Sequence, residues 1–249
     1  MKRFFSLCAL FGLAFYAIPL QAQKLPDIKG LGNQVQNGIT NVTGGNVSLT
    51  NDEVVGGLRE ALQVGTQKTV ERASVANGFF KNPSIKIPFP PEAKKMEATL
   101  KNVGMTKQVN KFVETLNRAA EDASKSITPV FVDAITKMSI ADGMSILKGS
   151  NDAATSYLRD KTTAELTLKI KPIIAASLKK VEITKYWNPL MKKYNSMPMV
   201  QKVNPNLEDY VTEKALVGLF KLLAEEEGKI RQDPAARVSD LLKKVFGNL

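Results

Sequence analysis

The sequence lacks histidine altogether and has one cysteine, Cys8, near its N-terminus. Without histidine there is no Ser-His-Asp triad, no histidine zinc site and no imidazole to act as a general base near neutral pH. If Cys8 is removed with the N-terminus, disulfides, thiolate nucleophiles and thiolate metal sites are excluded as well. The chain also has no glycine-rich phosphate loop and no EF-hand spacing. An enzyme with this composition would depend on carboxylates, Ser and Lys, Tyr or Arg, and we expect no cofactor and no metal.

The first 22 residues have the three zones of a secretory signal. Lys2 and Arg3 form a positively charged start, residues 4–18 are almost uninterruptedly apolar, and the segment ends on the small residue Ala22. The apolar run is shorter than the roughly 20 residues that a transmembrane helix needs. The pattern predicts a signal peptide over 1–22 and a periplasmic or otherwise exported product, soluble after cleavage and without a transmembrane helix. An uncleaved amphipathic or membrane anchor is the alternative.

The chain is basic, with 35 Lys and Arg against 24 Asp and Glu and a formal charge of +11. Between residues 166 and 204, eight lysines stand against the single acid Glu182. Lysines interleaved with aromatic residues can hold a nucleic acid or an anionic lipid surface, and export argues against nucleic acid. Anionic lipid headgroups or an envelope glycan are therefore the expected partners, and a solvated face whose lysine stems cover apolar surface is the alternative. The candidate binding residues are Lys169, Lys171, Lys179, Lys180, Lys185, Trp187, Lys192 and Lys193.

Composition divides the rest of the chain into a leader and a helical domain. Residues 23–49 are rich in Gly, Asn and Gln and have little periodicity, so we predict a flexible leader. Thr50 and Glu53 have the spacing of a capping box, and a helical domain is predicted over 50–249. Residues 77–91 break the helical pattern with prolines and alternating apolar residues. They predict an extended segment whose apolar side lies over a core, with a mobile flap as the alternative.

Apolar residues with helical spacing dominate from about residue 107 to the C-terminus. A kink is expected at Pro172, and Gly149 is expected to end a helix in the left-handed conformation. The sequence therefore predicts an all-α fold, a single compact bundle of about eight short to medium helices with an extended Pro-rich segment at 77–91. The helix starts predicted in this region are Thr128-Pro129, Ser139, Ser150 or Asn151, Thr162 or Thr163, Asn188-Pro189, Leu207 and Asp233-Pro234.

Acidic, amide and basic side chains gather between residues 114 and 160. Two carboxylates on neighbouring short helices could face each other across a cleft at the spacing of a glycosidase. In the alternative interpretation, Glu114 and Glu121 pair along one helix face with Arg118, and Asp142 offsets a helix dipole. The question is whether the polar residues line a cavity or form a buried structural network, and none is assigned a catalytic role. The candidate cluster consists of Asn117, Arg118, Glu121, Asp142, Asn151 and Arg159.

Six blocks of sequence resemble one known family. They are GLREALQVG (57–65), NRAAEDA (117–123), FVDAI (131–135), ADGMSILKGSNDAATSYLRDKT (141–162), YVTEKALVGLF (210–220) and IRQDPAARVSDLLKKVFG (230–247). Together they resemble the exported bacterial proteins catalogued as domain of unknown function 4197. The resemblance implies an all-α fold and a periplasmic or envelope setting in a Gram-negative-type bacterium, and it carries no activity and no catalytic residue across.

Three functions remain open from the sequence. The favoured interpretation is a non-enzymatic binding or accessory module for a hydrophobic or anionic cell-envelope component, because of the lysine concentration, the missing His and Cys chemistry and the apolar segment at 77–91. The alternative is a carboxylate-dependent hydrolase acting on an envelope polymer. A purely structural or assembly role is the third.

Overall fold

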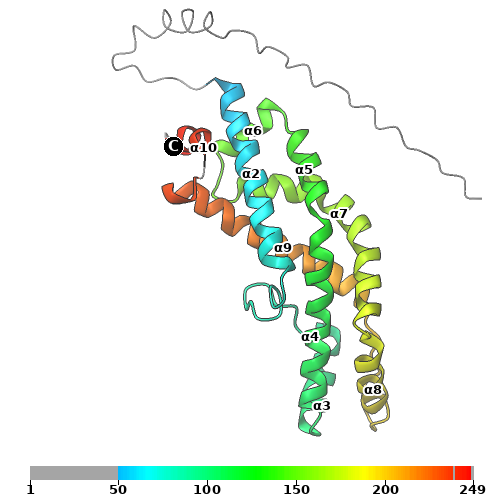
Figure 1. Ribbon diagram of the computed structural model, residues 1–249. Coiled ribbons are helices and arrows are strands. Elements are labelled where there is room, and N and C mark those ends of the chain that lie inside the picture. The colour runs from blue at the N-terminus through cyan, green and yellow to red at the C-terminus, as the bar shows by residue number, and fades with distance from the viewer. Residues whose placement is uncertain (1–49, 238, 248–249) are drawn as a thin grey trace, which may run out of the picture. The chain divides into compact units, whose positions relative to one another are not determined.

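The part of the chain that the structure describes is helical throughout. In the computed structural model, residues 50–237 and 239–247 are described, and they contain helices and turns but no β-strand. All of them fall within one compact unit (Figure 1). The predicted all-α bundle is therefore confirmed. The predicted signal peptide at 1–22 and the leader at 23–49 lie outside the described residues.

Helices follow one another closely along the chain. The capping box predicted at the start of the domain is present, since the Thr50 hydroxyl accepts the Glu53 N–H at 3.2 Å and the Glu53 carboxylate accepts the Thr50 N–H at 2.9 Å. Single 3-10 turns lie at Pro91–Ala93, Ser124–Ser126 and Pro234–Ala236. The α-helices are α2 (Asn51–Ser74), α3 (Lys94–Asn102), α4 (Thr106–Ala123), α5 (Thr128–Thr136), α6 (Ile140–Leu147), α7 (Ala153–Lys180), α8 (Ile183–Asn195), α9 (Leu207–Gln232) and α10 (Asp240–Gly247).

The central helix of the core is α9. It packs against α7, α2 and α4, and in Figure 1 it crosses behind α2 and α4. Its residues Leu219, Leu222 and Leu223 are almost inaccessible to solvent. Because an apolar helix stripe must be covered by other elements, these neighbours account for most of the burial. The other sides of α2 are covered by α5, α6 and α10.

A second part of the core lies where α3, α4 and α8 meet. The ring of Trp187 on α8 stacks on Phe112 of α4, with centroids 4.7 Å apart, and the ring of Phe89 lies 5.1 Å from Phe112. Aromatic pairs at these separations contribute about 0.5–1.5 kcal/mol beyond the area they bury. The sole tryptophan is thus a core residue, with only 7% of its surface exposed.

The 77–91 segment packs onto the helices, as predicted. Phe79, Ile85, Ile87 and Phe89 are all buried, and the Tyr210 hydroxyl of α9 donates a hydrogen bond to the Pro88 carbonyl at 3.1 Å. The apolar side chains of this segment therefore complete the core instead of forming a mobile flap.

Two of the predicted helix starts lie inside helices that begin earlier. Helix α7 continues through Thr162 and Thr163, whose hydroxyls donate to the carbonyls four residues earlier at 2.6 Å instead of capping a new helix. Helix α8 begins at Ile183 and contains Pro189, which was expected to open it. The chain turns between the two helices at Glu182, whose left-handed conformation (φ 53°) ends the α7 path.

Two further details near helix ends also differ from the predictions. Gly149 does not have a positive φ; a Cβ there would lie 2.6 Å from the Ala153 Cβ, so the close approach of α7 explains the glycine. Asp233-Pro234 begins only a 3-10 turn, in which the Asp233 carboxylate accepts the Ala235 N–H at 2.9 Å. The last helix begins later, at Asp240.

Candidate functional site

Asn117 joins α4 to the 77–91 segment. Its side chain is inaccessible to solvent, its Oδ1 accepts the Ile87 N–H at 2.8 Å, and its Nδ2 donates to the carbonyls of Ile87 at 2.8 Å and Val113 at 2.7 Å. The side-chain amide thus pairs with a backbone as a neighbouring strand would. Because both of its N–H donors are occupied, Asn117 has no donor left for a ligand.

Glu121 holds the beginning of the same segment. Its Oε1 accepts the N–H groups of Phe79 and Phe80, both at 3.1 Å, and its Oε2 accepts from the Arg118 guanidinium at 2.7 Å. Arg118 also donates to the Asn77 side chain at 2.9 Å, and Asn77 itself has a left-handed backbone (φ 72°). The carboxylate therefore fixes a turn that exposes backbone donors, and both of its oxygens are engaged.

The charges beside this turn favour ionised side chains. Partial burial acts to lower the pKa of Arg118, but its hydrogen bonds and ion pairs with Glu121 and Glu114 raise it overall. A hydrogen bond from Lys111 and the charge of Arg118 lower the pKa of Glu114. A general acid needs the opposite arrangement, in which the environment raises the pKa of a carboxyl group.

The other three members of the predicted cluster lie elsewhere. Asp142 forms a capping box with Ser139 at the start of α6, and hydrogen bonds from Ser139 lower its pKa. Asn151 is exposed in the turn before α7. The Arg159 guanidinium stacks on the Phe220 ring at 5.5 Å, beside a groove of about 690 Å³ between α7 and α9. A separate hollow of about 260 Å³ borders Arg118 and Glu121 but none of these three residues.

A second buried network was not predicted. Glu227 of α9 accepts the N–H groups of Ala154 at 3.0 Å and Thr155 at 2.8 Å, and it pairs with Arg231 at 3.0 Å. The Arg231 guanidinium also donates to the Ile146 carbonyl at 2.9 Å. An anion therefore caps the N-terminus of α7 and a cation lies at the C-terminus of α6, as the helix dipoles favour. Of these contacts, only the ion pair of Glu227 with Arg231 has a local i, i+4 spacing.

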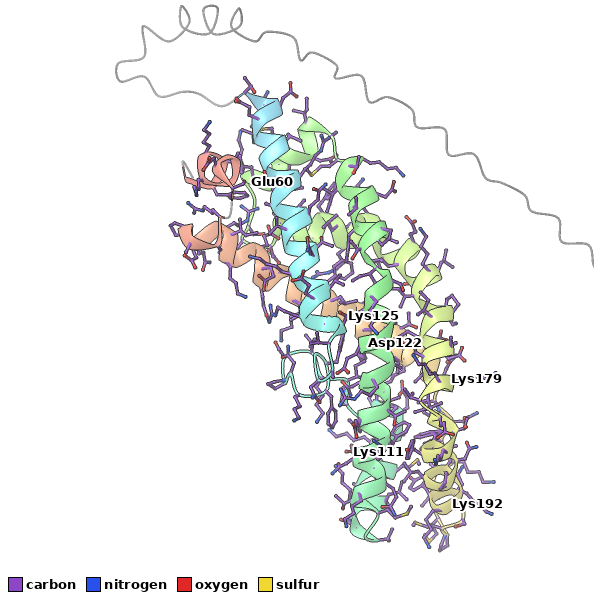
Figure 2. All side chains as sticks on the ribbon, viewed as in Figure 1. Glu60, Lys111, Asp122, Lys125, Lys179 and Lys192 are labelled. Atoms are coloured by element: carbon purple, nitrogen blue, oxygen red, sulfur yellow. The ribbon has the colours of Figure 1, made fainter. Side chains whose placement is uncertain are left out.

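The predicted lysine surface divides into paired and unpaired residues. Lys169, Lys171, Lys180 and Lys185 form ion pairs with Glu165, Asp209, Asp122 and Glu182 respectively. Trp187 lies in the core and is not part of the surface. The exposed members without an ion pair to any described residue are Lys179, Lys192 and Lys193. Figure 2 shows Lys179 and Lys192 projecting away from the bundle on the α7–α8 side.

Lysines from two distant parts of the sequence gather at one end of the bundle. We call residues 92–114 and 181–206 the basic end; these residues include α3, the first half of α4 and α8, which pack on one another. They contain nine lysines, no arginine and four glutamates, a formal charge of +5. Figure 2 labels one lysine on each side of this end, Lys111 on α4 and Lys192 on α8.

Residues 50–237 and 239–247 contain neither a membrane-spanning helix nor a metal-binding cluster. No helix in them is long and apolar enough to cross a bilayer. They also contain no group of three or more His, Cys, Asp or Glu residues arranged to hold a metal ion.

Comparisons with known proteins identify a family. A search of curated proteins gives no significant match, and neither does a search of solved structures. The family model described as "Protein of unknown function (DUF4197)" matches residues 48–247, which is most of the chain. The chain therefore belongs to the DUF4197 family of proteins of unknown function.

Proposed function

We propose that the protein is a non-enzymatic binding module for an anionic component of the cell envelope and that its basic end makes the contact. The observation that carries the proposal is the surplus of unpaired lysines at this end. The envelope setting rests on the signal-like sequence of residues 1–22.

Ion pairing leaves most of the lysines of the basic end available. Three of its four glutamates pair with lysines of the same end: Glu97 with Lys101, Glu114 with Lys111 and Glu182 with Lys185. Six lysines have no ion pair with a described residue: Lys94, Lys95, Lys107, Lys192, Lys193 and Lys202. By contrast, residues 50–74 and 207–247 contain ten basic and twelve acidic residues. The basic end is therefore positive where these two stretches are not, and its positive field attracts polyanions.

The arrangement on α8 suits a flat or extended partner. Ile183, Trp187, Leu190 and Tyr194 form its buried face, while Lys185 and Lys192 lie two turns apart on the opposite face. Each lysine close to an anionic surface contributes about 1 kcal/mol, so three or four together give weak, salt-sensitive binding.

The contacts of the carboxylates do not favour the hydrolase alternative. Glu121 holds backbone N–H groups and Arg118, and Asp142 caps α6. Neither contact resembles an acid–base pair facing each other across a substrate, as hydrolysis of a glycan requires.

Binding to a soluble polyanion and to anionic vesicles tests the proposal. We would measure binding of the protein to dextran sulfate and to phosphatidylglycerol-containing vesicles at low and at moderate salt. Replacing Lys107, Lys192 and Lys193 together by Ala should weaken binding to both by up to about 100-fold, at about 1 kcal/mol per lysine.

The matched control removes the same charge elsewhere. Lys81, Lys148 and Lys221 are also exposed, lie outside the basic end and have no ion pair with a described residue. Replacing these three by Ala should leave most of the binding intact. The proposal fails if the wild-type protein binds neither probe at low salt, or if the two triple variants lose equal affinity.

A further inference from the structure

We infer that the anionic component is a lipid bilayer and that the protein meets it with an apolar tip at the basic end. The inference rests on the proposed function and adds the class of partner and the orientation. We define the tip as two turns, residues 103–105 between α3 and α4 and residues 196–200 after α8.

Helix pairing brings these two turns to the same end. Figure 1 shows α8 running antiparallel to α4, and the Trp187 ring stacks on Phe112 at 4.7 Å. Seven residues further along α8 and seven residues back along α4 are each about 10 Å from that stack, at 1.5 Å per residue. Tyr194 and Met105 therefore lie at about the same level, and each turn adjoins one of them. In Figure 1, the α3–α4 turn and the end of α8 lie at the same end of the bundle.

Each turn exposes a large apolar side chain. Met199 is fully exposed, at 105% of its reference surface, and Val103 is 49% exposed. Met199 also has a left-handed backbone (φ 61°), which is uncommon for a residue other than glycine. A single exposed apolar side chain on a soluble surface is ordinary. Here, however, both lie at the same end of the bundle and near unpaired lysines.

The lysines are placed to contact headgroups while the tip enters the acyl boundary. Lys107 lies in the first turn of α4, just after Val103, and Lys192 and Lys193 lie in the last turn of α8, just before Met199. Cations beside a small apolar contact are the combination by which peripheral proteins bind anionic membranes. A sulfated or phosphorylated polymer offers the charges but no apolar phase for Met199, so only a bilayer uses both features.

The chain provides a matched pair of apolar surface sites for the test. Val103→Ser with Met199→Ser removes the apolar side chains of the tip. Leu168→Ser with Val217→Ser removes two other exposed apolar side chains, 77% and 57% exposed, on α7 and α9. None of these changes alters charge or an ion pair. Circular dichroism melting should be close to that of the wild-type protein for both variants, since all four side chains are exposed.

A comparison of vesicle binding with polymer binding tests the bilayer contact separately from the proposed anion binding. The tip variant should bind phosphatidylglycerol vesicles about 10- to 100-fold more weakly than the wild-type protein, and it should bind dextran sulfate as well as the wild-type protein does. Burying a Met or Val side chain contributes about 1.5–3 kcal/mol, and a tenfold change in affinity corresponds to about 1.4 kcal/mol. The Leu168/Val217 variant should match the wild-type protein with both probes. The inference is overturned if dextran sulfate is bound and vesicles are not, or if the tip variant binds vesicles normally; in either case the proposed function stands. Binding to neither probe overturns both.

Discussion

Replacing Glu121 by Ala should lower the free energy of unfolding by about 3 kcal/mol. The change leaves the N–H groups of Phe79 and Phe80 without an acceptor, and each buried unsatisfied donor costs about 1–3 kcal/mol. Losing one partner of a fully buried ion pair costs about 3–5 kcal/mol. The Arg118 side chain is 28% exposed and keeps its contacts with Asn77 and Glu114, so we add only a small part of that value.

Urea unfolding, followed by circular dichroism and by Trp187 fluorescence, measures this change. Trp187 is a suitable reporter because its ring lies 5.9 Å from Phe89 of the affected segment. Glu121→Gln keeps an acceptor for the two N–H groups but loses the charge beside Arg118, so its effect should be intermediate. Glu114→Ala removes a more exposed acid on the same helix, and the expected change is below about 0.5 kcal/mol. If Glu121→Ala unfolds at the same urea concentration as the wild-type protein, the carboxylate does not hold the segment.

Two further predictions concern α9. Glu227→Ala should lower the free energy of unfolding by about 3 kcal/mol, because the N–H groups of Ala154 and Thr155 lose their acceptor and the partly buried Arg231 loses its ion-pair partner. Calorimetry measures this change, and an unchanged melting temperature would contradict it. Burial acts to raise the pKa of Glu226, but hydrogen bonds from Lys229 and Arg72 lower it below its ordinary 4.5. Its folded pKa is depressed, so its contribution to stability is complete above pH 4.5 and is lost as the pH falls through the folded value. Urea unfolding between pH 7 and 3 should show this loss, and Arg72→Met should reduce it; an equal loss in the variant would refute the role of Arg72.

The elements that the sequence predicted well have both strong periodicity and local caps. Helix α2 begins with the Thr50 capping box, α6 with Ser139 and Asp142, and α9 at Leu207 after Asn206, whose side chain accepts the Asp209 N–H. In these cases the residues that define the helix start are within a few positions of one another. Local chemistry is then sufficient to predict the boundary.

The start of α7 could not be predicted in this way. Its first N–H groups are capped by Glu227, more than 70 residues away, and its own Asp152 makes no side-chain cap. Thr162 and Thr163 have the residue type of a cap but lie in mid-helix. A run of three glutamates also looks like a solvated face, and nothing local distinguishes the buried Glu227 from the partly exposed Glu225.

Some residues of the candidate site could be predicted from the sequence, but most of their contacts could not. Glu121 does lie beside Arg118 and Asn117, because positions three and four apart share a helix face, but the partner of Asn117 and Glu121 is the 77–91 backbone. Asp142 caps its own helix with Ser139, and Arg159 lies over the Phe220 ring of α9, so neither joins the other residues. The lysine-rich stretch was visible from 166 to 204, whereas the contribution of α3 and α4 to the same end depends on the pairing of α4 with α8.

The central position of α9 bears on the order in which the protein can fold. Arg72 at the end of α2 pairs with Glu225 and Glu226 across more than 150 residues of sequence, and α7 and α4 also pack on α9. During synthesis, α2, α4 and α7 emerge before the helix that covers them. Until residues 207–232 are available, the faces of these three helices that pack on α9 have no partner. The chain should therefore stay incompletely folded until its last fifth has been made, and truncation within α9 should prevent the native core from forming even though all the other long helices are present.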